Sequence, residues 1–379
     1  MGGGLRRSGT WYCVKVFLAV RIGISILGWL AVAVIPARDL ISVPGWAASS
    51  YTPGPHNLIT AFQAQDALWF LRIASDGYAS SDGSAAFFPL YPLTVRAVST
   101  IIGHHPLAAA LLVSNLAFLG ALIMLYRLTA SEFSETTARR AVLYTSLFPT
   151  SFFFFAPYSE SLFLLMAVTS FWGARKGKWW LAGIAGAGAA LTRSIGIVIA
   201  LALLAEALHQ KRQGKPGLAP KVAWSLTPVV GTLAYLGWWG SQGNWRAPLE
   251  FQSNWDRHPA FPLKTLVDAT HDAWVNGSYW LLDWLVVALV VSLAIYGLFK
   301  LRPTYSVYMW AGIVLPLCLI YESRPLMSMP RFAAVLFPLY WLLAKLSEER
   351  KIPHDLIVGV GAAGLALMAM LFVNAWFVF

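Results

Sequence analysis

The sequence predicts an all-α polytopic membrane protein, and composition, hydropathy and charge each support that class. Of the 379 residues, 58% are hydrophobic and 12% are charged, whereas soluble domains carry about 25% charged residues. Apolar runs of about 15 to 24 residues recur from end to end, as in helices that cross a bilayer. These observations exclude a disordered chain, a coiled coil and a cytosolic globular enzyme.

Apolar runs between charged breaks predict about eleven transmembrane helices. The first follows Arg6 and Arg7 and resembles a signal peptide, but Arg21 interrupts it, so we expect an uncleaved first span. The runs lie near residues 16–35, 106–126, 141–157, 159–174, 179–192, 195–208, 222–242, 280–299, 305–321, 332–346 and 356–379.

The distribution of basic residues predicts the orientation. With the N-terminus in the cytoplasm, Lys and Arg are roughly twice as frequent in the inner loops as in the outer segments. This bias also explains the net charge of +11 without a nucleic-acid partner. The long outer segments, about residues 36–105 and 243–279, are aromatic and mixed in sign. We therefore expect one integral membrane domain over 1–379 whose working face is extracytoplasmic.

Glycines within the apolar runs predict close helix packing. The run from Gly183 to Gly188 superficially resembles a nucleotide-binding loop, but no strand precedes it. Small residues let membrane helices approach one another closely, and we interpret Gly359, Gly361 and Gly364 in the same way. The seven histidines show no metal-ligand spacing, so we expect no metal site.

The first outer segment holds a candidate catalytic carboxylate, Asp66. Residues 61–78 are helical in pattern and Gly77 should end that helix. On it, Asp66, Trp69 and Phe70 share a face. Two prolines follow closely after Phe88, so we expect this part to lie along the membrane interface. Asp66 is either a solvated charge on an interfacial helix or a general base.

A second group comprises Tyr158, Glu160 and Arg193, which lie at the outer ends of short central runs. Short spans are tolerated where they border a water-filled cavity. The charges either mark helix ends or converge, because Glu160 and Arg193 come from neighbouring hairpins.

The second long outer segment and the last runs supply further candidates. In residues 251–259, which also include Gln252, the cluster of Trp255, Arg257 and His258 suits sugar stacking and phosphate pairing, or else forms an interfacial belt. Arg331 opens a later span from the outer side.

These motifs together resemble the PIG-V family of mannosyltransferases. The resemblance covers about residues 60–340, and its most specific parts run from Asp66 to Arg96 and from Ala156 to Ser161. One departure is Gln65, where the family commonly has Trp. Further matches lie at residues 148–153, 156–163, 192–194, 251–257, 330–332 and 336–338.

The resemblance implies a GT-C-type glycosyltransferase fold with interfacial helices in the first outer loop. It also implies a polyprenyl-phosphate-mannose donor, a glycolipid or other hydroxyl acceptor, a non-cytoplasmic site and no cofactor or metal. Asp66 is then the expected base of an inverting transfer, and the short chain suggests a prokaryotic member. The expected substrate-binding residues are Trp69, Phe88, Arg96, Tyr158, Glu160, Arg193, Gln252, Trp255, Arg257 and Arg331.

A transporter or flippase for a lipid-linked sugar is the alternative. It would also need an outward cavity lined by aromatic and cationic groups, but it predicts repeated halves and carboxylates at mid-membrane. No repeat is visible in the sequence, and the acidic candidates gather at outer ends.

Overall fold

Helices make up nearly all of the regular structure in the computed structural model, which describes residues 2–35, 43, 46, 52–79, 82–253, 257–321 and 323–374. In those residues the strands are β1 (Arg257–Pro259) and β2 (Leu319–Tyr321) alone. The predicted all-α class is therefore confirmed. The chain forms two compact units, the first within residues 1–78, 91–165 and 343–378 and the second within 79–90 and 166–342.

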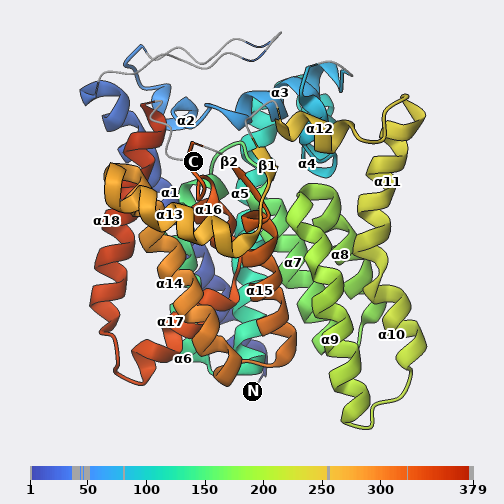
Figure 1. Cartoon of the computed structure of the whole chain (residues 1–379). Helices are drawn as coiled ribbons and strands as arrows, with labels where there is room; N and C mark the ends of the chain where they lie inside the picture. The colour runs from blue at the N-terminus through green and yellow to red at the C-terminus, as the bar shows by residue number, and fades with distance from the viewer. Residues whose placement is uncertain are drawn as a thin grey trace. The chain divides into compact units, whose positions relative to one another are not determined.

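The first unit is built on α1 (Gly2–Val34) and α5 (Pro106–Glu132), which pack against each other (Figure 1). Aromatic rings fill its core: the Phe118 and Phe154 ring centroids lie 4.6 Å apart, and those of Phe17 and Phe155 5.6 Å apart. The same unit contains α2 (Asn57–Thr60), α3 (Asp66–Asp76), most of α4 (Leu90–Ile101), α6 (Glu135–Ser146), η2 (Ser151–Phe154) and α18 (His354–Val373).

The second unit consists largely of packed helix pairs. In it α8 (Trp179–Thr192) packs against α11 (Thr227–Ser241), and α9 (Val198–Arg212) packs against α15 (Pro303–Leu317). Strands β1 and β2 pair antiparallel with Arg257 opposite Tyr321. The other elements of this unit are η1 (Ser84–Ala86), η3 (Ser194–Ile197), α10 (Leu218–Ser225), α12 (Ala247–Ser253), α13 (Pro262–Asn276), α14 (Ser278–Lys300) and α16 (Met329–Ala334).

Besides α4, two more helices are divided between the two units along the chain. These are α7 (Glu160–Arg175) and α17 (Pro338–Glu348).

Five helical stretches in the described residues are long and apolar enough to cross a membrane. They agree with the predicted runs 16–35, 106–126, 195–208, 280–299 and 356–379. The number of eleven spans is not confirmed, because the other six predicted runs hold shorter helices. In two of these runs a proline begins a new helix, at Pro228 of α11 and Pro338 of α17. The five stretches are Ser8–Val34, Pro106–Glu132, Ser194–Arg212, Trp280–Lys300 and His354–Val373.

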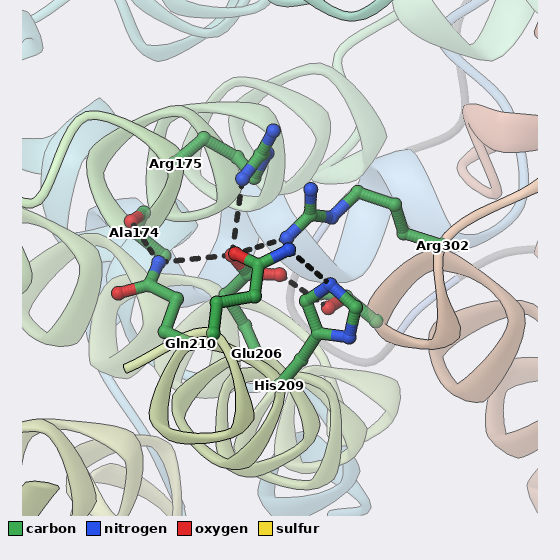
Figure 2. A network of polar contacts seen from close by, with 8 residues as sticks. Ala174, Arg175, Glu206, His209, Gln210 and Arg302 are labelled. Carbon is green, nitrogen blue, oxygen red and sulfur yellow. Dashed lines mark hydrogen bonds and ion pairs between the residues drawn. The ribbon is translucent and has the colours of Figure 1, made fainter. Parts of the chain in front are cut away.

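A buried carboxylate, Glu206, joins three helices of the second unit (Figure 2). Its Oε1 lies 3.1 Å from Nη1 of Arg175 and 3.3 Å from Nη2 of Arg302. The Thr304 hydroxyl donates to Oε2 at 2.6 Å, and Gln210 Nε2 donates to Oε1 at 2.9 Å. Because these partners come from α7, α9 and the segment where α15 begins, the carboxylate cross-links the three helices.

Most of the glycines predicted to allow close packing do so. A Cβ on Gly183 would lie 2.6 Å from the Trp224 ring, and one on Gly361 would lie 2.8 Å from the Leu147 carbonyl oxygen. Gly359 is an exception, because nothing lies within 4 Å of its Cβ position. The prediction was therefore right for Gly183 and Gly361 and wrong for Gly359.

We expect Gly361→Ala to destabilise the protein, because the new methyl group would press on the backbone at Leu147. Overpacking of this kind costs about 1–3 kcal/mol. The matched control is Gly359→Ala, on the same helix but in open space, which should leave the unfolding temperature unchanged or raise it slightly. Thermal unfolding of the purified protein in detergent measures both, and equal unfolding temperatures for the two variants would contradict the packing argument.

Candidate active site

Asp66 is the first residue of α3, and the residue before it has an unusual backbone conformation. Gln65 has φ 55° and ψ −124°, a positive φ that non-glycine residues seldom adopt. Gly77, with φ 89°, follows the helix, so the predicted end of the helix is confirmed. The helix begins at Asp66, however, and not near residue 61 as the pattern predicted. Asp66 is half-buried. A helix N-terminus favours negative charge, so the fold accommodates a carboxylate at this position.

Tyr158 holds the turn that leads into α3. Its hydroxyl donates to the Ala64 carbonyl oxygen at 2.8 Å, two residues before Asp66. The same carbonyl oxygen accepts the amide of Ala67 at 3.2 Å. Tyr158 is only 1% exposed and its ring lies 6.2 Å from that of Phe70. The structure therefore uses Tyr158 to fix the backbone at the start of α3.

A second tyrosine, Tyr91, packs against the same helix through Phe70. The Tyr91 ring meets the Phe70 ring edge-on at 4.9 Å. Its hydroxyl lies 2.8 Å from Ser114 Oγ, which donates to the Tyr158 carbonyl oxygen at 3.1 Å. Burial raises the pKa of the Tyr91 phenol well above its usual range, so the phenol stays protonated.

The other predicted residues of the first unit differ in exposure. Trp69 is half-buried, and the Arg72 guanidinium lies 5.7 Å from its ring centroid. Arg96 is exposed on α4, close to Gly77 where α3 ends. Glu160, the first residue of α7, is fully buried. Asp66, Trp69 and Arg96 thus lie on or beside α3.

Three predicted arginines of the second unit lie on or against one stretch of chain, residues 319–321 and 323–334, which we call the β2–α16 segment. The Arg257 guanidinium lies 4.5 Å from the Tyr321 ring centroid across the strand pair. The Arg193 guanidinium lies 5.4 Å from the ring centroid of Phe332. Arg331, buried with 9% exposure, belongs to α16 itself. The structure therefore brings Arg193, Arg257 and Arg331 to the same segment.

Phe88 belongs to the second unit and is held by Tyr235 of α11. The two ring centroids are 5.0 Å apart. The Tyr235 hydroxyl donates to the carbonyl oxygens of Ala85 and Phe87, at 2.8 and 2.9 Å.

Gln252 lies on α12, and Trp255 lies outside the described residues. The predicted approach of Glu160 to Arg193 stays a prediction, because the two residues belong to different units.

The sequence analysis did not predict that two acidic residues, Asp283 and Glu206, are buried in polar clusters. Asp283 accepts a hydrogen bond from Arg324 Nε at 2.7 Å, and Glu206 joins the helices described above. Both acids lie inside predicted apolar runs, at 280–299 and 195–208. An ionisable residue inside an apolar run marks a polar cluster, so the sequence carried a signal for both.

We expect Tyr158→Phe to loosen the turn before α3, because the Ala64 carbonyl loses its hydroxyl donor. The loss of one hydrogen bond should lower the free energy of unfolding by about 1 kcal/mol. Hydrogen exchange should quicken at the amides of Ala67 and Leu68, which bond back to residues 64 and 65. Tyr12→Phe is the control, since the Tyr12 hydroxyl donates to the Arg139 carbonyl, away from α3. Unchanged exchange at Ala67 and Leu68 would contradict this role for Tyr158.

Residues 40–212 match the family described as Mannosyltransferase (PIG-V). GPI mannosyltransferase 2 from Drosophila pseudoobscura pseudoobscura is 35% identical over 108 residues, which are 26% of this chain and 24% of that protein. The match to this curated relative therefore spans about a quarter of the relative's length.

Two solved structures resemble the fold. ArnT from Cupriavidus metallidurans, bound to undecaprenyl phosphate, aligns with a TM-score of 0.50 and 14% identity over 96% of this chain and 76% of that one. AglB from Archaeoglobus fulgidus, an oligosaccharyltransferase in complex with an inhibitory peptide and a dolichol-phosphate, aligns with a TM-score of 0.42 and 12% identity over 97% and 56%. The likeness to ArnT confirms the predicted GT-C type of fold. The predicted resemblance is confirmed as well: over residues 40–212 the chain is similar to the PIG-V mannosyltransferases.

Proposed function

We propose that the protein transfers mannose from a polyprenyl-phosphate-mannose donor to a hydroxyl group of a glycolipid or another membrane-associated acceptor. The match of residues 40–212 to the PIG-V mannosyltransferases carries this proposal. The fold adds support, because the similar ArnT structure holds undecaprenyl phosphate. We place the reaction on the extracytoplasmic side, since the loops predicted to be cytoplasmic carry most of the Lys and Arg residues.

Asp66 is the proposed general base. An alcohol attacks an anomeric carbon poorly unless its proton is removed, and a positioned base contributes about 10²–10⁴-fold to such a step. Asp66 is half-buried at the start of a helix, and the Tyr158 hydroxyl and the Gln65 conformation fix the turn before it. A base held in one place needs little reorganisation when the acceptor arrives.

The proposed reaction is a single displacement with inversion. The Asp66 carboxylate takes the proton of the acceptor hydroxyl while that oxygen forms a bond to the anomeric carbon of mannose. The bond between this carbon and the donor phosphate oxygen breaks on the opposite face, and the phosphate keeps the electron pair. A β-linked donor then yields an α-mannoside and polyprenyl phosphate.

The leaving phosphate gains negative charge, and we assign its stabilisation to arginines. Fixed cations placed where charge develops commonly make the largest contribution to catalysis. Arg193, Arg257 and Arg331 all contact or belong to the β2–α16 segment. Arg96, which is exposed on α4, is a further candidate. The proposal therefore invokes no metal or other cofactor.

The sugar and the acceptor need a surface on which to stack and polar groups to bind. We propose Trp69 and Phe88, both half-buried, and Trp255 as the aromatic surface. Gln252 and Glu160 are the proposed polar contacts. Tyr158, which we predicted as part of the aromatic surface, acts in this proposal by positioning Asp66, because its hydroxyl is engaged with Ala64.

Incubation of the purified protein with labelled polyprenyl-phosphate mannose and a membrane lipid extract tests the proposal. We expect label in a new lipid product, and mass analysis identifies both the sugar and the acceptor. The transporter alternative predicts a different result in liposomes, namely movement of the lipid-linked sugar across the bilayer without a new product.

We expect Asp66→Asn to lower the transfer rate by about 10²–10⁴-fold, because an amide cannot accept the acceptor proton. Expression and donor binding should remain close to those of the unaltered protein. Asp76→Asn is the matched control: it changes the other acidic residue of α3, which is exposed at the far end of the helix. Near-normal turnover of Asp66→Asn would show that another group is the base.

A further inference from the structure

We propose that Asp283 and Arg324 form a clamp that positions the β2–α16 segment to bind the phosphate of the lipid donor, an inference that rests on the proposed function. Both side chains are almost fully buried, at 3% and 6% exposure, and Arg324 Nε donates to Asp283 Oδ2 at 2.7 Å. Neither residue was predicted to belong to the site.

The clamp ties the segment to α14 at two neighbouring positions. Asp283 lies on α14, and Trp280, three residues earlier on the same face, donates from Nε1 to the Ser323 carbonyl oxygen at 3.2 Å. Successive residues of the segment, Ser323 and Arg324, are thus bonded to one face of one helix. On the other side of these contacts, β2 pairs with β1, which carries Arg257.

Hydrogen-bonded turns lead from Arg324 to Arg331. The amide of Met327 donates to the Arg324 carbonyl oxygen at 2.9 Å, and that of Met329 donates to the Leu326 carbonyl oxygen at 3.0 Å. Ser328 has φ 70°, in the left-handed region that favours glycine. A displacement at Arg324 would therefore be transmitted along a short constrained path to α16 and to the guanidinium of Arg331.

Physical chemistry favours a positioning role for this pair over a purely stabilising one. Taking two charges out of water is unfavourable, and apolar residues of similar size often stabilise a fold as well or better. A charge-assisted hydrogen bond gives in return a defined distance and direction. A segment that must hold cations at set positions around a phosphate needs that geometry.

The test compares the neutralisation of two different buried carboxylates in the second unit. Asp283→Asn removes the charge at the clamp, and Glu206→Gln removes it from the cluster in Figure 2. Glu206 bonds near the beginning of α15, whereas β2 follows the end of α15, so roughly 22 Å of helix separates the two sites. Both changes should lower the unfolding temperature, but only Asp283→Asn should change the KM for the polyprenyl-phosphate-mannose donor.

We expect Asp283→Asn to raise the KM for polyprenyl-phosphate mannose about tenfold and to lower kcat as well, because the displaced arginines bind the donor phosphate and stabilise its charge as it leaves. The acceptor KM should stay nearly unchanged. The double variant Asp283→Asn/Arg324→Gln removes both charges of the pair, so it should fold even where the single variant leaves the Arg324 charge buried opposite an amide. It should show the same rise in donor KM, while Glu206→Gln keeps the KM of the unaltered protein.

Three outcomes would overturn the inference. The first is a folded double variant with the donor KM of the unaltered protein, and the second is a Glu206→Gln variant with an equal rise in donor KM. Hydrogen exchange on the unaltered chain supplies the third: undecaprenyl phosphate should protect the amides of residues 324–331, and unchanged exchange there would refute the inference without any variant. If the unaltered protein neither binds undecaprenyl phosphate nor transfers mannose, the proposed function fails and the inference falls with it.

Discussion

The hydrogen bond from the Tyr158 hydroxyl to the Ala64 carbonyl is the interaction on which the candidate catalytic helix depends. It holds the turn at Gln65, whose backbone conformation would otherwise relax. Ser114 bonds to the Tyr158 carbonyl, and Tyr91 bonds to Ser114. A polar chain buried among aromatic rings therefore decides where α3 begins. Since Asp66 is the first residue of α3, the same chain decides where the carboxylate lies.

The similarity to the PIG-V mannosyltransferases divides the candidate site in two. Residues 40–212 include Asp66, Trp69, Phe88, Arg96, Tyr158, Glu160 and Arg193. Arg257 and Arg331 lie beyond that range, yet the structure joins them to Arg193 through the β2–α16 segment. The base and the cations of the proposed reaction therefore differ in their support. Asp66 lies in the range that is similar to the PIG-V mannosyltransferases and its role as base stays a prediction, whereas three-dimensional contacts within one unit group the arginines.

The sequence predicted the elements that depend on local chemistry. The helix at Asp66 and its end at Gly77 follow from apolar periodicity and a glycine stop, and α8 has the predicted bounds of 179–192. The five long apolar helices were predicted because each is an uninterrupted apolar run in the sequence. The broken helices at α10–α11 and α16–α17 were missed, because hydropathy averages over a window and does not register a proline that begins a new helix.

The residues of the candidate site could be proposed from the sequence, but their contacts could not. Asp66 and the arginines could be chosen because charged groups at the ends of apolar runs are conspicuous. The role of Tyr158 could not be predicted, because a tyrosine in an aromatic run is equally suited to a surface or to the core. Its bond to Ala64 joins residues 94 positions apart in the chain, and single-sequence patterns carry no information on such pairs.

The two buried carboxylates of the second unit, Glu206 and Asp283, differ in the number of partners described for each. Glu206 faces two arginines, a threonine and a glutamine from three parts of the unit, so its cluster is redundant and tolerates the loss of one bond. The one charge-assisted contact described between Asp283 and Arg324 is short and nearly free of solvent. A cluster with several bonds to one carboxylate keeps the helices joined when one of those bonds is lost. A short charge-assisted bond such as that between Asp283 and Arg324 fixes the distance and direction between its two side chains. That difference is why we associate the Asp283 pair with the placement of cations and the Glu206 cluster with the joining of helices.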